Sequence, residues 1–315
     1  MTARAGRPFR FGVSMRAAGS RAEWQAKART VEELGFNVLL VPDHLAAVFP
    51  PLTALCTAAE ATTRLRFGTF VLNNDFRHPV LVAREVAAID LLTDGRFELG
   101  IGAGHAAEEY EGIGLRYSDG RARAARLAEA VGIIRPLLAG EVVEHTGVHY
   151  QVAAQRVFPT PRQARVPVLV GGNSRAVLRL AAEEADIVGF TGFFTQSGGG
   201  GAARLAHFTA AGLDDRLDIV RAAAGERFTA LELNVLVQTV VRTDDVVAAS
   251  TERAGQMPGL SAQQLLESPF LLFGTPRGMA DALIARRARF GVSYIVVFER
   301  DMETLAPVVA LLRGR

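Results

Sequence analysis

The stretch DGRFELGIGAGH, residues 94–105, carries the pattern that decides the fold. The apolar run at residues 96–101 predicts a short buried strand, and Gly102, Ala103 and Gly104 follow it directly. A helical pattern that begins at Pro79 precedes this strand, and another with apolar residues three or four positions apart spans residues 127–138. A strand between two helices is the repeating unit of a parallel α/β sheet.

The same alternation runs along the whole chain. Apolar runs predict eight strands, at residues 9–14, 37–42, 66–72, 96–101, 167–170, 186–190, 231–240 and 294–298. Eight strands in alternation with helices favour an α/β fold of the closed (β/α)8 TIM-barrel type over an open doubly wound sheet. We expect a single domain over residues 1–315. Insertions are expected after strands four, six and seven, at residues 141–161 (a hairpin or arm), 191–212 (a mobile loop) and 244–268 (helices).

Composition narrows the range of partners. Hydrophobic residues make up 49% of the chain and charged residues 22%, which predicts a packed globular core. The net charge is only +2 and the basic residues are interspersed with acidic ones, so we expect no nucleic-acid partner. The single cysteine, Cys56, excludes an internal disulfide. Residues 1–10 lack a signal-peptide pattern and no apolar run approaches the roughly 18 residues of a membrane span, so we expect a cytoplasmic protein without a membrane partner.

Functional residues of a barrel lie just beyond the carboxyl ends of its strands. Asp43 and His44 follow the second predicted strand, and a carboxylate beside an imidazole can transfer protons near neutral pH. A structural histidine bonded to loop backbone is the alternative. We expect no metal site, because the other histidines show no ligand spacing.

Glycines follow the fourth strand. Gly102 and Gly104 let backbone amides approach a ring or a phosphate closely, although glycines also end ordinary strands. The segment is not a dinucleotide-binding fingerprint, because Ala107 stands where the third glycine would be.

A second glycine-rich segment follows the fifth strand and opens a helix. It consists of Gly171, Gly172, Asn173, Ser174 and Arg175. Free amides at the helix start, the helix dipole, a hydroxyl and an arginine together predict a phosphate cradle. An ordinary capped junction between strand and helix is the alternative.

Four segments, taken in chain order, resemble the luciferase-like monooxygenase superfamily, and most closely its actinobacterial branch that uses coenzyme F420. They are residues 42–44 (PDH), 67–72 (FGTFVL), 78–104 (from HP to DGRFELGIGAG) and 167–172 (PVLVGG). The resemblance spans nearly the whole chain, and DGRFELGIGAG is its most specific part. It implies a bacterial-luciferase-like barrel that holds coenzyme F420, or FMN, at the carboxyl ends of its strands.

The resemblance also implies roles for single residues. A cis peptide bond between Phe70 and Val71 would form a bulge against the cofactor ring, and His44 would take the hydroxyl proton of a substrate, with His105 as the second candidate for a catalytic role. The predicted cofactor-binding residues are Asp43, Phe70, Val71, Asn73, Gly102, Ala103, Gly104, Gly171, Gly172, Asn173, Ser174 and Arg175.

Two positions depart from the sugar-phosphate dehydrogenases of this branch. Those enzymes have a glutamate where this chain has His105 and a tryptophan where it has Val48, which argues against sugar-phosphate activity. The leading hypothesis is therefore an F420-dependent oxidoreductase that exchanges hydride with another small organic substrate. An FMN-dependent monooxygenase, a non-catalytic flavin-binding protein and a metal-dependent hydrolase are the alternatives, in that order. By analogy with the family we expect a homodimer.

Overall fold

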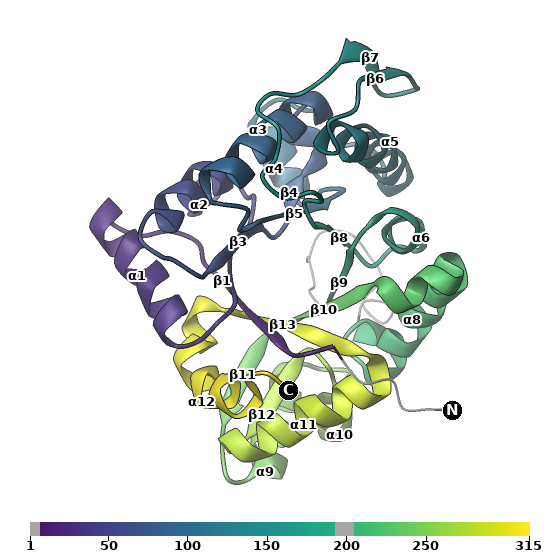
Figure 1. Ribbon diagram of the computed structural model, residues 1–315. Helices are drawn as coiled ribbons and strands as arrows, with labels where there is room; N and C mark the ends of the chain where they lie inside the picture. The colour runs from purple at the N-terminus through teal and green to yellow at the C-terminus, as the bar shows by residue number, and fades with distance from the viewer. Residues whose placement is uncertain (1–6, 193–204) are drawn as a thin grey trace.

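The computed structural model describes residues 7–192 and 205–315. Parallel strands close into a barrel that helices surround (Figure 1). The eight barrel strands are β1 (Arg10–Ser14), β2 (Val38–Val41), β3 (Arg66–Thr69), β5 (Phe97–Gly102), β8 (Val168–Gly171), β9 (Ile187–Thr191), β10 (Glu232–Val237) and β13 (Val292–Phe298). The ring closes because β13 pairs in parallel with both β10 and β1. The predicted (β/α)8 barrel is confirmed, and the open doubly wound sheet is excluded.

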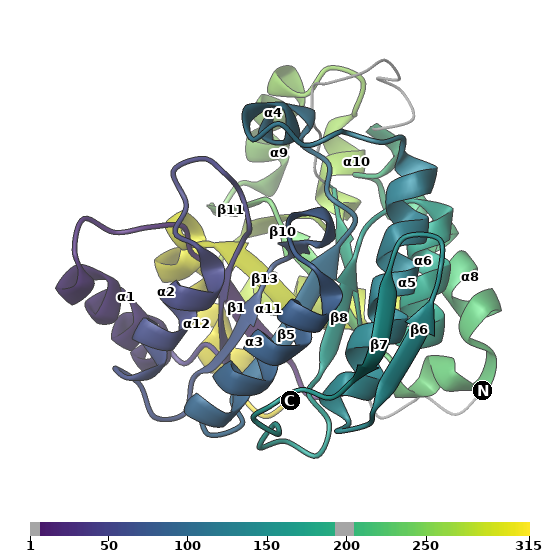
Figure 2. The same cartoon turned by 90° about the horizontal axis from the view of Figure 1, so that it is seen from above.

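Helices connect the strands around the outside. α3 (Pro79–Leu92) begins at its proline and α11 (Pro276–Phe290) begins after Thr275 and ends at Gly291, as the sequence predicts. The other helices are α1 (Arg21–Glu33), α2 (Pro51–Ala59), α4 (Ala107–Gly112), α5 (Gly120–Leu138), α6 (Arg175–Glu184), α8 (Ala210–Ala224), α9 (Val246–Gln256), α10 (Ala262–Glu267) and α12 (Met302–Leu312). Figure 2 shows α4, α9 and α10 at one end of the barrel and the C-terminus at the other. Because α4 follows β5, the end with these three helices is the carboxyl end of the strands.

Two predicted strands are each divided in the structure. The run predicted at residues 66–72 forms β3 up to Thr69 and a separate short strand, β4 (Leu72–Asn73), and the peptide bond between Phe70 and Val71 is cis, as the resemblance implied. The run predicted at residues 231–240 forms β10 and then β11 (Thr239–Arg242), which pairs with β12 (Leu271–Gly274) in a small separate sheet. The sequence analysis missed β12.

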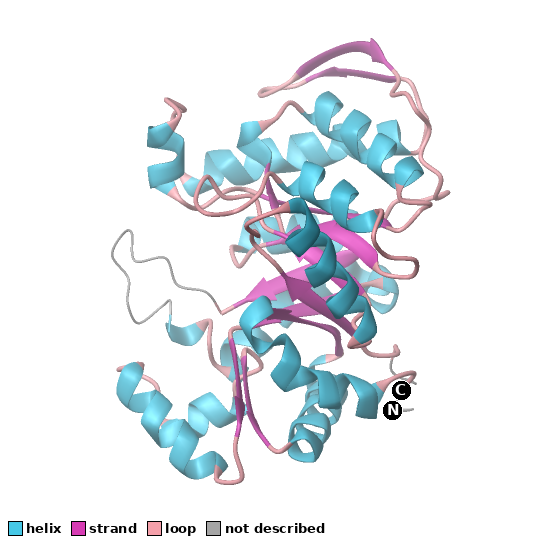
Figure 3. Cartoon of the chain, turned by 90° about the vertical axis from the view of Figure 1, so that its left-hand side faces the viewer, coloured by secondary structure: helices cyan, strands magenta, loops and turns pink. Residues whose placement is uncertain are grey.

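The insertions lie outside the ring of strands. The segment after β5 and α5 contains an antiparallel hairpin of β6 (Val143–Thr146) and β7 (Gln151–Gln155), one of the two predicted forms, which projects over the helices (Figure 3). The segment after β11 holds α9 and α10, as predicted. Most of the insertion predicted at residues 191–212 falls on residues 193–204, which are outside the described part of the chain.

Side chains close the end of the barrel at which the strands begin. Arg10 forms ion pairs of 2.5 Å with both Glu98 and Glu232, and the Tyr294 hydroxyl donates to Glu98 at 2.7 Å. Burial raises the pKa of Glu232, while Arg10 opposes that shift. Above this cluster, buried aliphatic side chains from β2, β8, β9 and β13 fill the interior. The described interior of the barrel is therefore a packed core and not a channel.

Candidate cofactor-binding site

A cavity of about 510 Å³ opens at the carboxyl ends of the barrel strands. It is lined by both predicted catalytic histidines and by every predicted cofactor-binding residue except Arg175, which is exposed at the start of α6. Strand ends that are far apart in sequence are thus brought to one site. The lining residues from these predictions are Asp43, His44, Phe70, Val71, Asn73, Gly102, Ala103, Gly104, His105, Gly171, Gly172, Asn173 and Ser174.

Glycines on β5 and β8 form a wall of bare backbone beside Val71. A Cβ atom at Gly102 would lie 2.7 Å from Val71 Cγ2, and one at Gly171 would lie 3.2 Å from Val71 Cγ1. A Cβ atom at Gly100 would lie 2.0 Å from the Thr69 carbonyl oxygen. Any larger residue at Gly100 or Gly102 would displace the segment that joins β3 and β4, so the flat wall depends on glycine at these positions.

Asp43 anchors the segment after β3 to the end of β2. Its carboxylate accepts hydrogen bonds from Arg77 at 2.6 and 3.2 Å and from the backbone N–H of Asn73 at 3.0 Å. The Asp43 side chain is only 5% exposed, whereas that of Arg77 is 25% exposed. The bidentate pair fixes the loop that carries both Asp43 and His44 into the cavity.

His44 forms a pair with Glu109, which the sequence analysis missed. His44 Nδ1 lies 2.8 Å from Glu109 Oε1, and that oxygen also accepts from the Leu45 backbone N–H at 3.3 Å. The carboxylate favours a hydrogen on Nδ1, which leaves Nε2 as an acceptor. Because Glu109 lies in α4, beyond the glycines after β5, no local sequence signal connects it to His44.

His105 lies edge-on to His44, with ring centroids 5.4 Å apart. Burial, and then the neighbouring His44 and Arg123, lower the pKa of His105 below its ordinary value of 6.5, while Glu109 opposes this shift. The His105 imidazole is therefore neutral at pH 7. The His44 ring contacts the carboxylate of Glu109, which can assist His44 as a base.

The segment predicted to hold a phosphate, Gly171 to Ser174, also lines this cavity. Ser174 caps α6 by accepting a hydrogen bond from Val177 N at 3.3 Å, and a Cβ atom at Gly172 would lie 2.7 Å from Val177 Cγ1. Among the described residues, no acceptor faces the backbone N–H groups of Asn173 and Ser174. Free amides at the start of a helix, next to a position where a Cβ atom would not fit, are suited to a phosphate group.

Other strand ends contribute lining residues that the sequence analysis did not single out. Except for Arg123, they lie in or just after the last residues of β1, β9, β10 and β13, whereas the sequence analysis considered only the loops after strands two to five. Most of them could have been found by examining the ends of all eight predicted strands. No sequence signal pointed to Arg123, which lies in α5. These residues are Ser14, Arg16, Arg123, Phe190, Thr191, Leu236 and Phe298.

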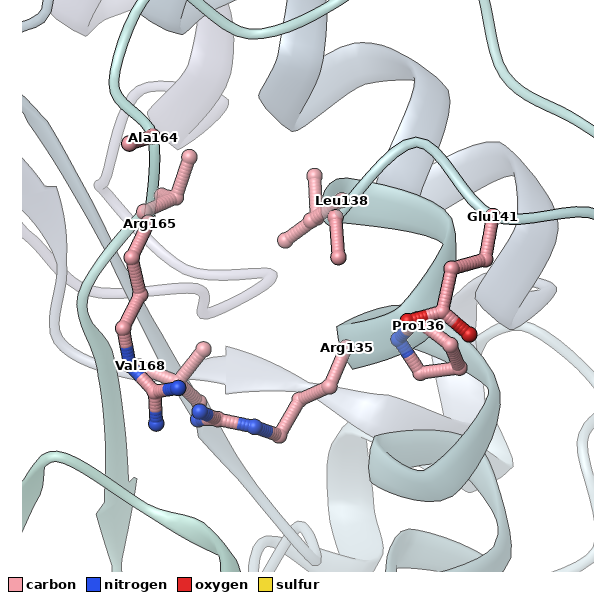
Figure 4. Close-up of a pocket in the computed structure, with 9 residues that line it drawn as sticks. Arg135, Pro136, Leu138, Glu141, Ala164, Arg165 and Val168 are labelled. Atoms are coloured by element: carbon pink, nitrogen blue, oxygen red, sulfur yellow. The ribbon is translucent and has the colours of Figure 1, made fainter.

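A second cavity, of about 440 Å³, lies where β8 begins, at the other end of the barrel (Figure 4). Arg135 and Arg165 line it, but both guanidinium groups bind the carboxylate of Asp186, at 3.1 and 2.7 Å. Their charges are compensated within the protein. This cavity contains no predicted site residue.

Within residues 7–192 and 205–315 there is no group of three or more histidine, cysteine, aspartate or glutamate side chains that could hold a metal ion. None of the described helices is both long enough and apolar enough to span a membrane.

The closed barrel and the cavity at its carboxyl end place the chain in the class of (β/α)8 barrel proteins that bind ligands on this face. The model of the luciferase-like monooxygenase family matches residues 7–251. The chain belongs to the luciferase-like monooxygenase family.

Individual relatives carry different functions on this fold. An F420-dependent glucose-6-phosphate dehydrogenase of Microbacterium testaceum is 35% identical over 178 residues, which cover 53% of this chain and 50% of that protein. The chain thus matches about half the length of this curated relative. The F420-dependent tetrahydromethanopterin reductase of Methanopyrus kandleri has a TM-score of 0.75 at 18% identity, covering 98% of this chain and 100% of the other. EDTA monooxygenase of Chelativorans sp. BNC1 has the same TM-score at 16% identity, with 98% and 94% coverage. At such identities the structures establish the shared fold alone.

Proposed function

We propose that this protein is a coenzyme F420-dependent oxidoreductase that transfers hydride between the deazaflavin and a small organic substrate. The observation that carries the proposal is one cavity that joins a glycine wall, a phosphate cradle and a histidine–carboxylate pair. The curated relative named as an F420-dependent dehydrogenase supports this choice of cofactor.

The residues present fit such a cofactor. Gly171, Gly172, Asn173 and Ser174 would hold its phosphate, and Val71, which packs against the bare backbone of Gly102, would lie against its ring. When bound, the deazaflavin supplies the hydride chemistry, and the protein supplies orientation and proton handling.

His44 is the proposed proton partner. Glu109 holds its ring through Nδ1, so that Nε2 is the nitrogen left to accept a hydroxyl proton from a substrate in the cavity. The carboxylate also stabilises the imidazolium that this step forms. His105 is kept neutral by its lowered pKa and remains the second candidate for a catalytic role.

Cofactor choice is tested by titration with both candidates. F420 and FMN each carry a phosphate that the same cradle would accept, so the fold does not separate them. We expect saturable binding of F420 in the micromolar range and no saturable binding of FMN. The opposite result would replace the proposal with an FMN-dependent monooxygenase.

Turnover is tested with a substrate panel. The panel contains small alcohols, ketones, aldehydes and glucose 6-phosphate, and F420 absorbance reports on hydride transfer in either direction. We expect turnover with a non-phosphorylated compound and none with the sugar phosphate, because His105 and Val48 replace the residues of those dehydrogenases. Binding of F420 without turnover of any compound would favour a non-catalytic carrier. Wild-type turnover by His44→Ala would remove His44 from the mechanism.

We also propose that the protein works as a homodimer in the cytoplasm. α3 exposes Leu81 at 51% and Leu92 at 74%, which lie about three turns apart and therefore on one face of the helix. A second copy that covered this face would bury both side chains. Light scattering after size-exclusion chromatography should give twice the chain mass, and Leu81→Glu combined with Leu92→Glu should give the monomer.

A further inference from the structure

Arg216 is a buried cation without a carboxylate partner. Its residue is only 3% exposed, and it takes part in no salt bridge among the described residues. Residues 1–6 and 193–204, which the structure does not describe, contain no aspartate or glutamate. The charge is therefore held within the protein by dipoles and ring faces.

Oxygen atoms from three segments accept hydrogen bonds from the guanidinium group. Nε donates to the Gly212 carbonyl at 2.9 Å and Nη2 to the His207 carbonyl at 2.7 Å. Nη1 donates to Asn173 Oδ1 at 2.6 Å and to the Thr191 carbonyl at 3.1 Å. Arg216 thus connects α8 to the carboxyl ends of β8 and β9, where the cradle lies.

Two phenylalanine rings complete the environment of Arg216. The guanidinium carbon lies 5.7 Å from the Phe190 ring centroid and 5.1 Å from that of Phe270. Burial lowers the pKa of Arg216 to about 10, a shift that the neighbouring Asp215 opposes, so the group is still charged at neutral pH. A buried charge that forms no ion pair is unfavourable unless hydrogen bonds or a bound anion compensate it.

Asn173 is where this charge meets the cavity. Arg216 binds its Oδ1, and its Nδ2 donates to the Thr191 carbonyl at 2.8 Å, so both ends of the amide are fixed. The backbone N–H groups of Asn173 and Ser174, which have no acceptor among the described residues, are held in the cradle by this arrangement.

We propose that Arg216 is a positioning residue for the cofactor phosphate, which holds Asn173 in place and gives the cradle the positive charge that a phosphate compensates. The inference rests on the proposed function only in requiring a phosphate-bearing ligand, and it holds for F420 and for FMN. A merely structural Arg216 would affect all ligands of the cavity equally.

The test compares ligands with and without the phosphate. Dissociation constants are measured by fluorescence titration for F420 and its phosphate-free ribityl chromophore, and for FMN and riboflavin. The proteins are wild type, Arg216→Met, Arg216→Lys and Arg221→Met. Arg221 is the matched control, because it lies on the same helix, 42% exposed, and pairs with Asp218 at 2.9 Å.

We expect Arg216→Met to weaken binding of the phosphorylated ligand by about tenfold or more, as for a charge acting over several ångströms at an effective dielectric constant of about 20. The phosphate-free ligand should bind as in wild type, Arg216→Lys should retain most of the preference, and Arg221→Met should retain all of it. Equal loss for both ligands, or no loss for either, would overturn the proposal.

Two further measurements cover other outcomes. If Arg216→Met does not fold, Asn173→Ala replaces it, because it removes the side chain that Arg216 holds: the phosphorylated ligand should lose affinity while the phosphate-free ligand does not, and equal loss for both would overturn the proposal. If wild type binds neither F420 nor FMN, the proposed function fails on its own. Stabilisation of wild type by inorganic pyrophosphate, absent in Arg216→Met or Asn173→Ala, would then still support the inference, and its absence in wild type would overturn it.

Discussion

The pair of Asp43 and Arg77 allows a quantitative test of how the loop at the end of β2 is held. Arg77→Met leaves the Asp43 carboxylate, which is 5% exposed, with the Asn73 backbone N–H at 3.0 Å as its remaining hydrogen-bond donor among the described residues. Removing one partner of a buried ion pair costs about 3–5 kcal/mol. Arg77 is 25% exposed, so water can solvate part of the remaining charge, and we take about 2–3 kcal/mol. With about 2 cal/mol/K of unfolding entropy per residue, this lowers the Tm of 315 residues by about 3–5 °C.

A double-mutant cycle separates the ion pair from the loss of side-chain packing. Urea unfolding is measured for wild type, Arg77→Met, Asp43→Asn and the double variant. Once Asp43 is an uncharged amide, Arg77→Met should cost less than about 1 kcal/mol. Equal costs of Arg77→Met in the two backgrounds, within about 0.5 kcal/mol, would refute the reasoning. Arg21→Met is the control, because its partner Glu60 lies 3.4 Å away with both side chains more than two-thirds exposed, and its effect should stay within about 0.5 kcal/mol.

Glu109, Gly104 and His105 each give a further prediction. Glu109→Gln removes the charge beside His44, which is 30% exposed. A hydrogen bond to a charged group contributes roughly 1.5–3 kcal/mol, and at the low end of this range kcat with the best panel substrate should fall about tenfold. The cofactor KM should not change, and a wild-type kcat would contradict the proposed role. Gly104→Ala should cost about 2–4 kcal/mol in urea unfolding, because φ is +73° and a Cβ atom would lie 2.1 Å from a side-chain atom; Gly114→Ala, with the same φ and open space, should cost only about 1 kcal/mol. Because the pKa of His105 is lowered in the folded protein, the unfolded chain takes up this proton at a higher pH, so the stability that the neutral ring contributes is complete above about pH 6.5 and is lost as the pH falls. In urea unfolding between about pH 5 and 8, His105→Gln should lose less stability with falling pH than wild type. An unchanged dependence of stability on pH would argue against the shift.

The barrel could be predicted because its signals are local. Each strand is a run of apolar residues, and helix ends are fixed by residues such as Pro79, Thr275 and Gly291, whose effects depend on their immediate neighbours. The position of Gly171 to Ser174 was predictable for the same reason, since these residues stand directly between a strand and a helix, while their phosphate-binding role stays a prediction. Strand ends in a parallel barrel meet on one face, so correct strands were enough to bring His44 and Gly172 to one cavity.

Contacts between distant segments could not be predicted in this way. Glu109 meets His44 across 65 positions, and Arg216 meets Asn173 across 43, so each pair depends on how a loop or helix returns over the barrel. The division of the run at residues 66–72 also depends on distant residues, because the Thr69 carbonyl and the Val71 side chain pack against glycines of β5 and β8. An apolar run carries no record of such a neighbour, and it therefore predicted one continuous strand.

The position of Glu109 bears on the choice of substrate. The sugar-phosphate dehydrogenases that the sequence resembles have a glutamate where this chain has His105, directly after the glycines of β5. Here the carboxylate beside His44 comes instead from Glu109, four positions further along, while burial keeps His105 neutral at pH 7. His44, the proposed base, therefore has a carboxylate partner, but an uncharged ring stands at the position of the glutamate of those dehydrogenases. We expect this exchange to favour substrates with less polar surface than a sugar phosphate, and His105→Glu should shift the panel preference towards more polar alcohols.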